Sequence, residues 1–335
     1  MIPQFINSKI TMKKYIVLSL SFLCILSLGF FFLSNSESKL EEIKNPRVLS
    51  MTASVDVPEE VTFAEETTKL DRYDLYERYD REINSFTYFH STTMLLMKRA
   101  NRYFPIIVPI LKKNGIPEDF KYLAVIESSL NPRAISVAKA VGLWQFMPAT
   151  GKQYGLEITA EVDERYHIEK STEAACKYLK SAYAKYGNWK DVALSYNGGM
   201  GRITGELEKQ LEYSGLDLWL VEETARYYFR MLAIKEVFEN PYKYGFVLKA
   251  NQFYKPIKFK EVTVSESIND FTSFAKRNGI SYAQLKDFNS WLRDRKLTIS
   301  ANSSKTYTIL IPTQESLYYK KGERIEVYDS RWVSE

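Results

Sequence analysis

Apolar residues recur at helical spacing through most of residues 70–245. One amphipathic stretch begins near Tyr73, another ends at Asn114-Gly115, and a long one runs from Glu222 to Asn240. Residues spaced i, i+3, i+4 and i+7 share one face of a helix, and an apolar face of this kind packs against a core. The pattern therefore predicts an all-helical domain over residues 70–245.

The helix expected to begin at Pro117 carries an acid on its apolar face. The stripe consists of Phe120, Leu123, Ala124 and Glu127. Burial disfavours the charged form of a carboxyl group and raises its pKa, which keeps a Glu protonated as a general acid near neutral pH. The ordinary alternative is that Glu127 reaches water or an Arg at the helix end. Because Asn131-Pro132 is expected to end this helix, we expect Glu127 to open into a cleft.

Three shorter helices are expected before residue 200. The first spans Trp144–Tyr154. The second begins at a cap formed by Ser171 or Thr172. The third spans Trp189–Tyr196. The last helix ends in Tyr196-Asn197-Gly198-Gly199, where glycines would let the backbone approach a ligand. A simple glycine cap beside a core Tyr is the alternative for this motif.

Past Pro241 the pattern changes from helical spacing to a mixture of strands and short helices. Strands are predicted for Phe253–Val264 and Tyr307–Ile311, with helices for Ile268–Asn278 and Ala283–Asn289 between them. This order predicts a small α+β module, βααβ, over residues 255–314, followed by a tail over residues 315–335.

The start of the chain has the pattern of an export segment. Lys13-Lys14 precedes an almost wholly apolar run from Tyr15 to Leu33. A run of this length is also able to span a bilayer, so residues 1–36 are predicted to be a signal peptide or a membrane anchor. Residues 37–69 are poor in large apolar side chains and are predicted to be a linker.

Composition narrows the range of functions. The 335 residues carry a net charge of +5 that is spread along the chain without blocks, which does not favour a nucleic-acid partner. Cys24 and Cys176 lie far apart in the sequence and predict no disulfide framework. His90 and His167 lack the spacing of metal ligands, and no nucleotide or triad motif is present, so no metal and no cofactor are expected.

Several motif blocks follow one another along the helical region. They are Glu127-Ser128, Asn131-Pro132, Gly142-Leu143-Trp144-Gln145, Ser195-Tyr196-Asn197-Gly198-Gly199, and Glu223-Thr224 with Tyr227. In this order they resemble the lytic transglycosylases related to goose-type lysozyme, and among these most closely the membrane-bound lytic murein transglycosylase D group. The C-terminal module resembles a LysM module, a small fold that binds polymers containing N-acetylglucosamine.

The resemblance implies a lysozyme-like catalytic domain and a peptidoglycan lyase. Such an enzyme cleaves the β-1,4 bond between MurNAc and GlcNAc without water and leaves 1,6-anhydroMurNAc ends. Glu127 is implied as the acid and then the base of this reaction. By family position, the residues implied to hold the sugar are Ser128, Gln145, Tyr196, Asn197 and Tyr227. The expected partner is the glycan strand of peptidoglycan. The protein is expected to be a monomer in the cell envelope, attached to the membrane through its N-terminal segment.

Two positions and one short segment depart from the family patterns. Lys139 stands where the transglycosylases usually have Gly, and Ser195 where they usually have Ala. If the family glycine needs a positive φ, Lys139 strains or reshapes its loop. In the C-terminal module, Ser265-Glu266-Ser267 replaces the Gly-Asp-Thr that usually follows the first LysM strand, so glycan binding by this module is left open.

Two alternative functions remain open on the sequence. A hydrolytic glycosidase normally needs two carboxylates, and Glu223 is the nearest candidate for the second. A Glu in the first turn of a helix more commonly serves the helix dipole, however. A lysozyme-type hydrolase of the same fold and a non-catalytic peptidoglycan-binding protein are therefore the alternatives to the lyase.

Overall fold

The computed structural model describes residues 53–334 and begins with a hairpin. Strands β1 (Glu60–Phe63) and β2 (Glu66–Lys69) pair antiparallel. The two residues between them, Ala64 and Glu65, both have positive φ, as a tight two-residue hairpin turn requires. Phe63 is fully buried. The prediction of a linker up to residue 69 is therefore wrong at its end, because the hairpin packs into the core.

Eight α-helices follow in the described chain before residue 240. They are α2 (Tyr73–Tyr88), α3 (His90–Lys113), α4 (Lys121–Ser128), α5 (Pro148–Gln153), α6 (Ile168–Tyr186), α7 (Trp189–Gly198), α8 (Met200–Gln210) and α9 (Glu222–Glu239). The prediction of a mainly helical domain is confirmed.

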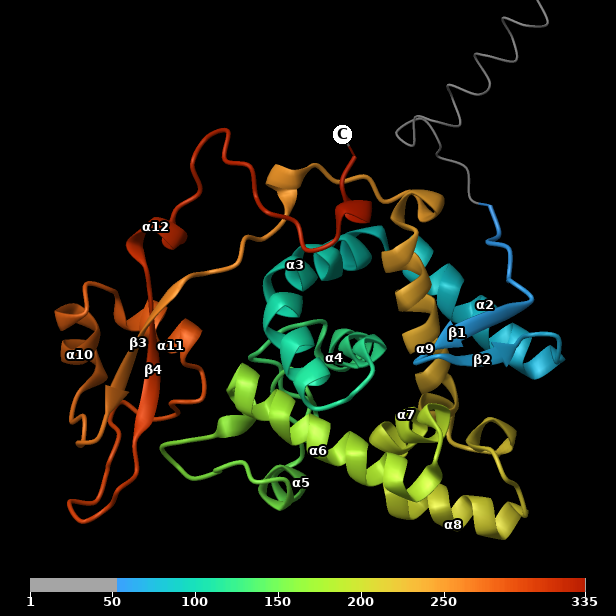
Figure 1. Cartoon of the computed structure of the whole chain (residues 1–335), viewed down its shortest axis with the longest axis horizontal. Coiled ribbons are helices and arrows are strands. Elements are labelled where there is room, and N and C mark those ends of the chain that lie inside the picture. The colour runs from blue at the N-terminus through green and yellow to red at the C-terminus, as the bar shows by residue number, and fades with distance from the viewer. Residues whose placement is uncertain (1–52, 335) are drawn as a thin grey trace, which may run out of the picture. The chain divides into compact units, whose positions relative to one another are not determined.

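Helix α4 is the central element of this domain, and it lies between α3 and α9 (Figure 1). All its residues from Lys121 to Ile126 are buried, which is typical of a helix enclosed on every side. Its first turn is preceded by a 3-10 turn at Glu118–Phe120. The helix that carries Glu127 is therefore held by packing along its whole length.

The structure corrects three predicted helix boundaries. Helix α4 ends at Ser128 because Ser129 is left-handed, so the chain leaves the helix before Asn131-Pro132. Pro148 does not break a helix that began at Trp144; it occupies the first turn of α5, where its missing N–H costs nothing. Helix α6 begins at Ile168, so Thr172 lies inside its first turns and its hydroxyl donates to the Ile168 carbonyl at 2.7 Å.

The C-terminal module has the predicted order of elements. Strands β3 (Phe259–Val264) and β4 (Tyr307–Pro312) pair antiparallel. Between them in the sequence lie helices α10 (Phe271–Arg277) and α11 (Tyr282–Phe288), and a short α12 (Gln314–Leu317) follows β4. Its core includes Val141, Val162 and Tyr166 from the helical domain. The module thus shares a core with the loops that follow Glu127.

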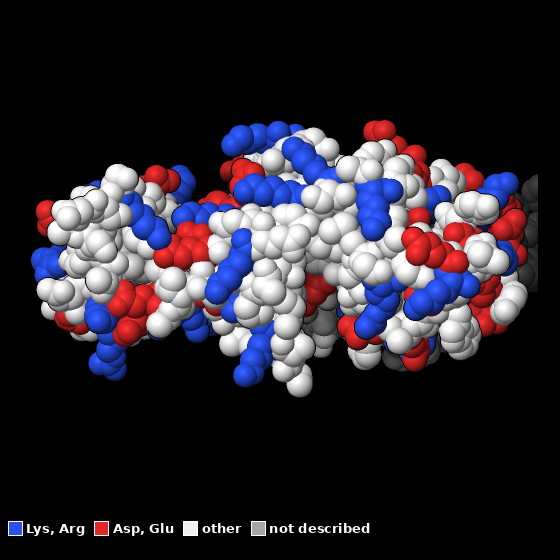
Figure 2. Space-filling view, turned by 90° about the horizontal axis from the view of Figure 1, so that it is seen from below, with Lys and Arg blue, Asp and Glu red and all other residues white. Residues whose placement is uncertain are grey.

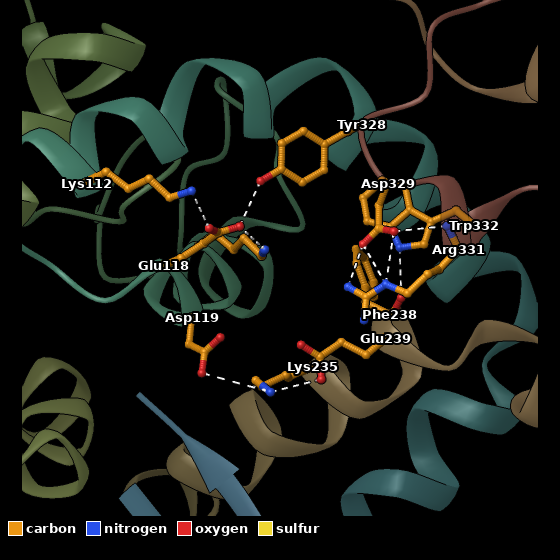
Figure 3. Close-up of polar contacts among 11 residues, drawn as sticks. Lys112, Glu118, Asp119, Lys235, Phe238, Glu239, Tyr328, Asp329, Arg331 and Trp332 are labelled. Carbon is orange, nitrogen blue, oxygen red and sulfur yellow. Dashed lines mark hydrogen bonds and ion pairs between the residues drawn. The ribbon is translucent and has the colours of Figure 1, made fainter. Parts of the chain in front are cut away.

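The last residues return to the helical domain instead of forming a free tail. Trp332 is 1% exposed, and its indole N–H donates to the Phe238 carbonyl at 2.8 Å. The Tyr328 hydroxyl donates to Glu118 at 2.9 Å, and Lys112 reaches the same carboxylate (Figure 3). The end of the chain therefore helps to fix the turn from which α4 starts.

The described residues contain no helix long and apolar enough to cross a membrane. The predicted export segment, residues 1–36, lies outside the described residues. On the face seen from below, basic and acidic side chains are interspersed (Figure 2).

Candidate active site

Glu127 lies in the last turn of α4, as predicted, and is half-buried. The Tyr227 hydroxyl, from the second turn of α9, donates a hydrogen bond to its carboxylate. The helical spacing of Tyr227 is compatible with an ordinary core residue. Only the family resemblance predicts that it lies at the site. The structure brings the two side chains together across 100 positions of sequence.

Burial raises the pKa of Glu127 from its ordinary value of 4.5 to about 7. The Tyr227 hydrogen bond and the charge of Arg230 oppose this rise, whereas the nearby Glu223 adds to it. Burial also holds the pKa of the Tyr227 hydroxyl well above 10, so that it stays a neutral donor. Glu127 is consequently able to hold a proton at neutral pH and to release it within the same range, as a general acid and base must.

The loop after Glu127 is locally strained. Seven non-glycine residues of the described chain have positive φ, and four of them lie here: Ser129, Leu130, Lys139 and Gln145. Lys139 has a φ of 65°, which agrees with the expectation that its family glycine occupies a left-handed position. Strain of this kind persists only where the surroundings impose it, and it is frequent at functional sites.

Two features of the described chain hold this loop in place. A side chain at Gly142 would lie 2.0 Å from the Arg165 carbonyl oxygen, so only glycine permits this close approach. The buried Arg165 side chain donates to the carbonyls of Lys139 and Phe146 at 3.2 and 3.0 Å, and it pairs with Asp163 at 2.7 Å. Sequence reasoning missed Arg165, because nothing in the local pattern marks it.

Gln145 and Tyr196 meet at this loop. The Gln145 side-chain amide donates to the Gly142 carbonyl at 2.8 Å, which leaves its oxygen without an intramolecular donor among the described contacts. The Tyr196 hydroxyl donates to the Trp144 carbonyl at 2.8 Å and makes no hydrogen bond to Glu127. Tyr196 therefore supports the residue beside Gln145, and a direct contact with the sugar stays a prediction.

Asn197 joins the end of α7 to the start of α9. Its oxygen accepts a hydrogen bond from Thr224 at 2.7 Å, and its amide donates to Glu223 at 3.3 Å. The side chain is half-buried. This places the Tyr196-Asn197-Gly198-Gly199 motif next to the helix that carries Tyr227.

Ser128 is buried, and its hydroxyl donates back to the Ala124 carbonyl at 3.1 Å. In this arrangement only its acceptor lone pairs remain for a ligand, and its predicted role in sugar binding stays a prediction. Arg230, which sequence reasoning did not single out, donates to the Ile126 carbonyl at 3.4 Å. Its position three residues after Tyr227, on the same face of α9, was the signal that could have identified it.

The site thus combines one half-buried carboxyl group at a helix end, a phenol that hydrogen-bonds to it, and a neighbouring strained loop with a polar amide. This constellation defines a candidate site for acid–base chemistry that uses a single carboxyl group. Within the described residues, no group of three or more His, Cys, Asp or Glu side chains is arranged to hold a metal ion.

Two known protein families match parts of this chain. Residues 104–215 match the transglycosylase SLT domain, and residues 260–315 match the soluble lytic transglycosylase C-terminal LysM-like domain. The chain therefore contains an SLT domain followed by a LysM-like domain, as the sequence motifs predicted. The SLT match contains Glu127 and the motifs from Gly142 to Gly199.

Individual proteins similar to this chain are named as transglycosylases. The chain is 29% identical over 229 residues to membrane-bound lytic murein transglycosylase D of Escherichia coli, covering 67% of this chain and 49% of that protein. It is 37% identical over 123 residues to peptidoglycan transglycosylase gp16 of Escherichia phage T7, covering 36% of this chain and 9% of that protein. The chain thus spans about half the length of the first of these relatives.

Among solved structures, the chain is similar to the 70 kDa soluble lytic transglycosylase of Escherichia coli. The two are 23% identical, with a TM-score of 0.35, over 41% of this chain and 24% of that chain.

Proposed function

We propose that this protein is a peptidoglycan lytic transglycosylase of the cell envelope. The observation that carries the proposal is Glu127, a carboxyl group with a pKa of about 7 that lies within the SLT domain and receives a hydrogen bond from Tyr227. The SLT and LysM-like domains favour peptidoglycan as the substrate. The membrane-bound relative and the apolar run from Tyr15 to Leu33 favour an exported, membrane-attached protein.

One carboxyl group suffices for this reaction because the substrate supplies its own nucleophile. Protonated Glu127 gives its proton to the glycosidic oxygen between MurNAc and GlcNAc, and GlcNAc leaves with a new hydroxyl group. The resulting Glu127 carboxylate takes the proton from the C6 hydroxyl of MurNAc while that oxygen bonds to C1. The 1,6-anhydro ring closes, no water is consumed, and Glu127 is protonated again for the next turnover.

A lysozyme-type hydrolase is the second candidate. Glu223 favours it, because its charge is close enough to raise the pKa of Glu127. A hydrolase would need Glu223 to activate water or to bond to the sugar. Glu223 is instead exposed and accepts a hydrogen bond from Asn197, which does not favour either role.

Mass spectrometry of digested peptidoglycan separates these functions. We expect anhydroMurNAc ends from the wild type, and a loss of turnover of at least about a thousandfold in Glu127→Gln. Reducing ends that depend on Glu223 would establish the hydrolase instead. A wild-type protein that binds sacculi and releases no fragments would reject both enzymatic functions.

A further inference from the structure

A cavity lies apart from Glu127, between the helical domain and the LysM-like domain. It has a volume of about 320 Å³ and is lined by residues of both domains, including Arg99, Arg102, Leu130, Phe288 and Trp291. None of the residues predicted to bind the sugar lines it. Its volume lies at the lower end of the range for small-molecule pockets.

The cavity nevertheless adjoins the candidate active site. Leu130 and Asn131, which line it, follow Glu127 by three and four residues. The Arg99 guanidinium, which also lines it, donates to the Ser129 carbonyl at 2.9 Å. A ligand in this cavity would therefore lie beside the end of α4.

The Trp291 side chain has an unused donor in this wall. Trp291 is 3% exposed, and its indole N–H is buried without a hydrogen-bond partner in the described structure. The ring stacks on Tyr307 at 5.7 Å and lies 5.6 Å from His167, so its orientation is fixed. A buried donor that makes no hydrogen bond costs about 1–3 kcal/mol, and an acceptor from a ligand would recover this cost.

Two arginines give the same wall an excess of positive charge. Arg99 and Arg102 have no carboxylate partner among the described ion pairs. Arg102 donates through Nε to the Lys255 carbonyl at 3.1 Å and packs over the Tyr254 ring. Each guanidinium has five N–H donors, so each keeps donors for a ligand.

Two further charged residues of the cavity, Arg133 and Glu169, have polar neighbours of their own. Arg133 pairs with Asp287 at 2.9 Å, and Glu169 lies 3.1 Å from His167 Nδ1. The remaining wall is largely apolar, with Tyr103, Ile106 and Phe259 among its residues. The ligand that fits these walls has an apolar body and at least one carboxylate.

We propose that this cavity binds a short carboxylate-bearing peptide, of the kind that peptidoglycan stems present. The proposal rests on the proposed function for the choice of peptide. Arg99 and Arg102 bind the carboxylate, the Trp291 N–H donates to a peptide carbonyl or carboxylate oxygen, and the aromatic wall packs against the alkyl side chains. Both domains are needed, so the LysM-like domain contributes to substrate selection through Trp291 and Phe288.

Calorimetric titration of the full chain carrying Glu127→Gln tests the proposal without turnover. The probes are a synthetic stem tetrapeptide with free carboxylates, the same peptide with its carboxylates amidated, and a GlcNAc tetramer. We expect the free acid to bind, and its Kd to rise at least about tenfold on amidation and in Arg99→Gln, Arg102→Gln and Trp291→Phe. Arg277→Gln removes one exposed positive charge outside the cavity and should leave the Kd unchanged.

Amidation changes the peptide and leaves the cavity residues unaltered, so the proposal stays falsifiable if a cavity variant misfolds. No binding of the free acid up to about 1 mM, or equal affinities for acid and amide, would overturn it. A GlcNAc tetramer whose binding depends on Trp291, with no peptide binding, would make the cavity a glycan site instead.

Product analysis keeps the two proposals apart. A protein that forms anhydro ends but does not bind the free-acid peptide would refute the cavity assignment alone. A protein that binds the peptide as expected but cleaves no glycan would refute the proposed function alone.

Discussion

Helix α9 contacts two acids, the buried Glu82 on α2 and the half-buried Glu127 on α4, and it presents a different partner to each. Toward α2 it presents Arg226, whose guanidinium hydrogen-bonds to Glu82, a residue that is 1% exposed. Toward α4, one position later in the sequence, it presents Tyr227, whose hydroxyl bonds to Glu127. The first acid forms an ion pair with Arg226, whereas the second receives its hydrogen bond from a neutral donor and is affected by Arg230 only through that residue's charge.

This difference separates a structural carboxylate from a reactive one. An arginine holds a carboxylate in its charged form and leaves no proton to transfer. A phenol supports the carboxylate without cancelling the effect of burial, and the pKa of Glu127 remains near 7. The partner, rather than the burial of the acid alone, decides which of the two positions is suited to acid–base catalysis.

The largest expected effect comes from removing the countercharge of Glu82. In Arg226→Met we expect the free energy of unfolding to fall by about 3 kcal/mol, because an unpaired carboxylate is left buried. Arg81→Met is the control, since its pair with Glu222 is exposed and should contribute little to stability. Denaturant unfolding measures both, and equal losses would contradict the distinction between the two acids.

The second prediction concerns Glu127 and the pH dependence of stability. Its folded pKa of about 7 lies above its ordinary value of 4.5, so the folded state holds a proton that the unfolded state releases as the pH rises between these values. Wild-type stability should therefore fall through this window, by about 2 to 3 kcal/mol, relative to Glu127→Gln. Unfolding at pH 3.5 and at pH 8 measures the difference. A stability difference between the two proteins that is the same at both pH values would show that the pKa of Glu127 is not raised.

A smaller effect is expected from removing the neutral donor. Tyr227→Phe removes a hydrogen bond that lowers the pKa of Glu127, so the alkaline limb of the pH–rate profile should move to higher pH. We also expect turnover at the optimum to fall about tenfold, which corresponds to about 1.4 kcal/mol. Tyr228→Phe is the matched control, because that hydroxyl contacts Thr68 at 3.1 Å. A shift of the limb in the control, or none in Tyr227→Phe, would argue against the assigned contact.

The smallest effect is expected at Tyr196. Its hydroxyl donates to the Trp144 carbonyl, so Tyr196→Phe should lower the free energy of unfolding by about 1 kcal/mol and reduce turnover less than Tyr227→Phe does. Tyr186→Phe, which loses a similar bond to the Met200 carbonyl, provides the control for stability. Unchanged melting together with a turnover loss of tenfold or more would instead indicate that Tyr196 contacts the substrate.

The local pattern of the sequence was enough to find the helix of Glu127 and the acid on its apolar stripe. The order of the motif blocks predicted Gln145, Tyr196 and Asn197 as sugar-binding residues, and this role stays a prediction. It did not reveal Arg165, because a buried arginine that bonds to the carbonyls of a distant loop has no local sequence signal. The hairpin at Glu60–Lys69 was also missed, because its short strands are mostly polar and their buried residues are Phe63 and the polar Thr68.

The sequence by itself determined most of the helices and the order of elements in the βααβ module, because helical and strand spacing depend on near neighbours. Only the tertiary structure decided that Tyr227 meets Glu127 while Arg226 meets Glu82. Both residues lie on α9, and their partners lie more than 90 positions earlier in the chain. Adjacent positions on a helix point in directions about 100° apart, so the packing of α2 and α4 around α9 selects which acid receives a charge and which receives a phenol.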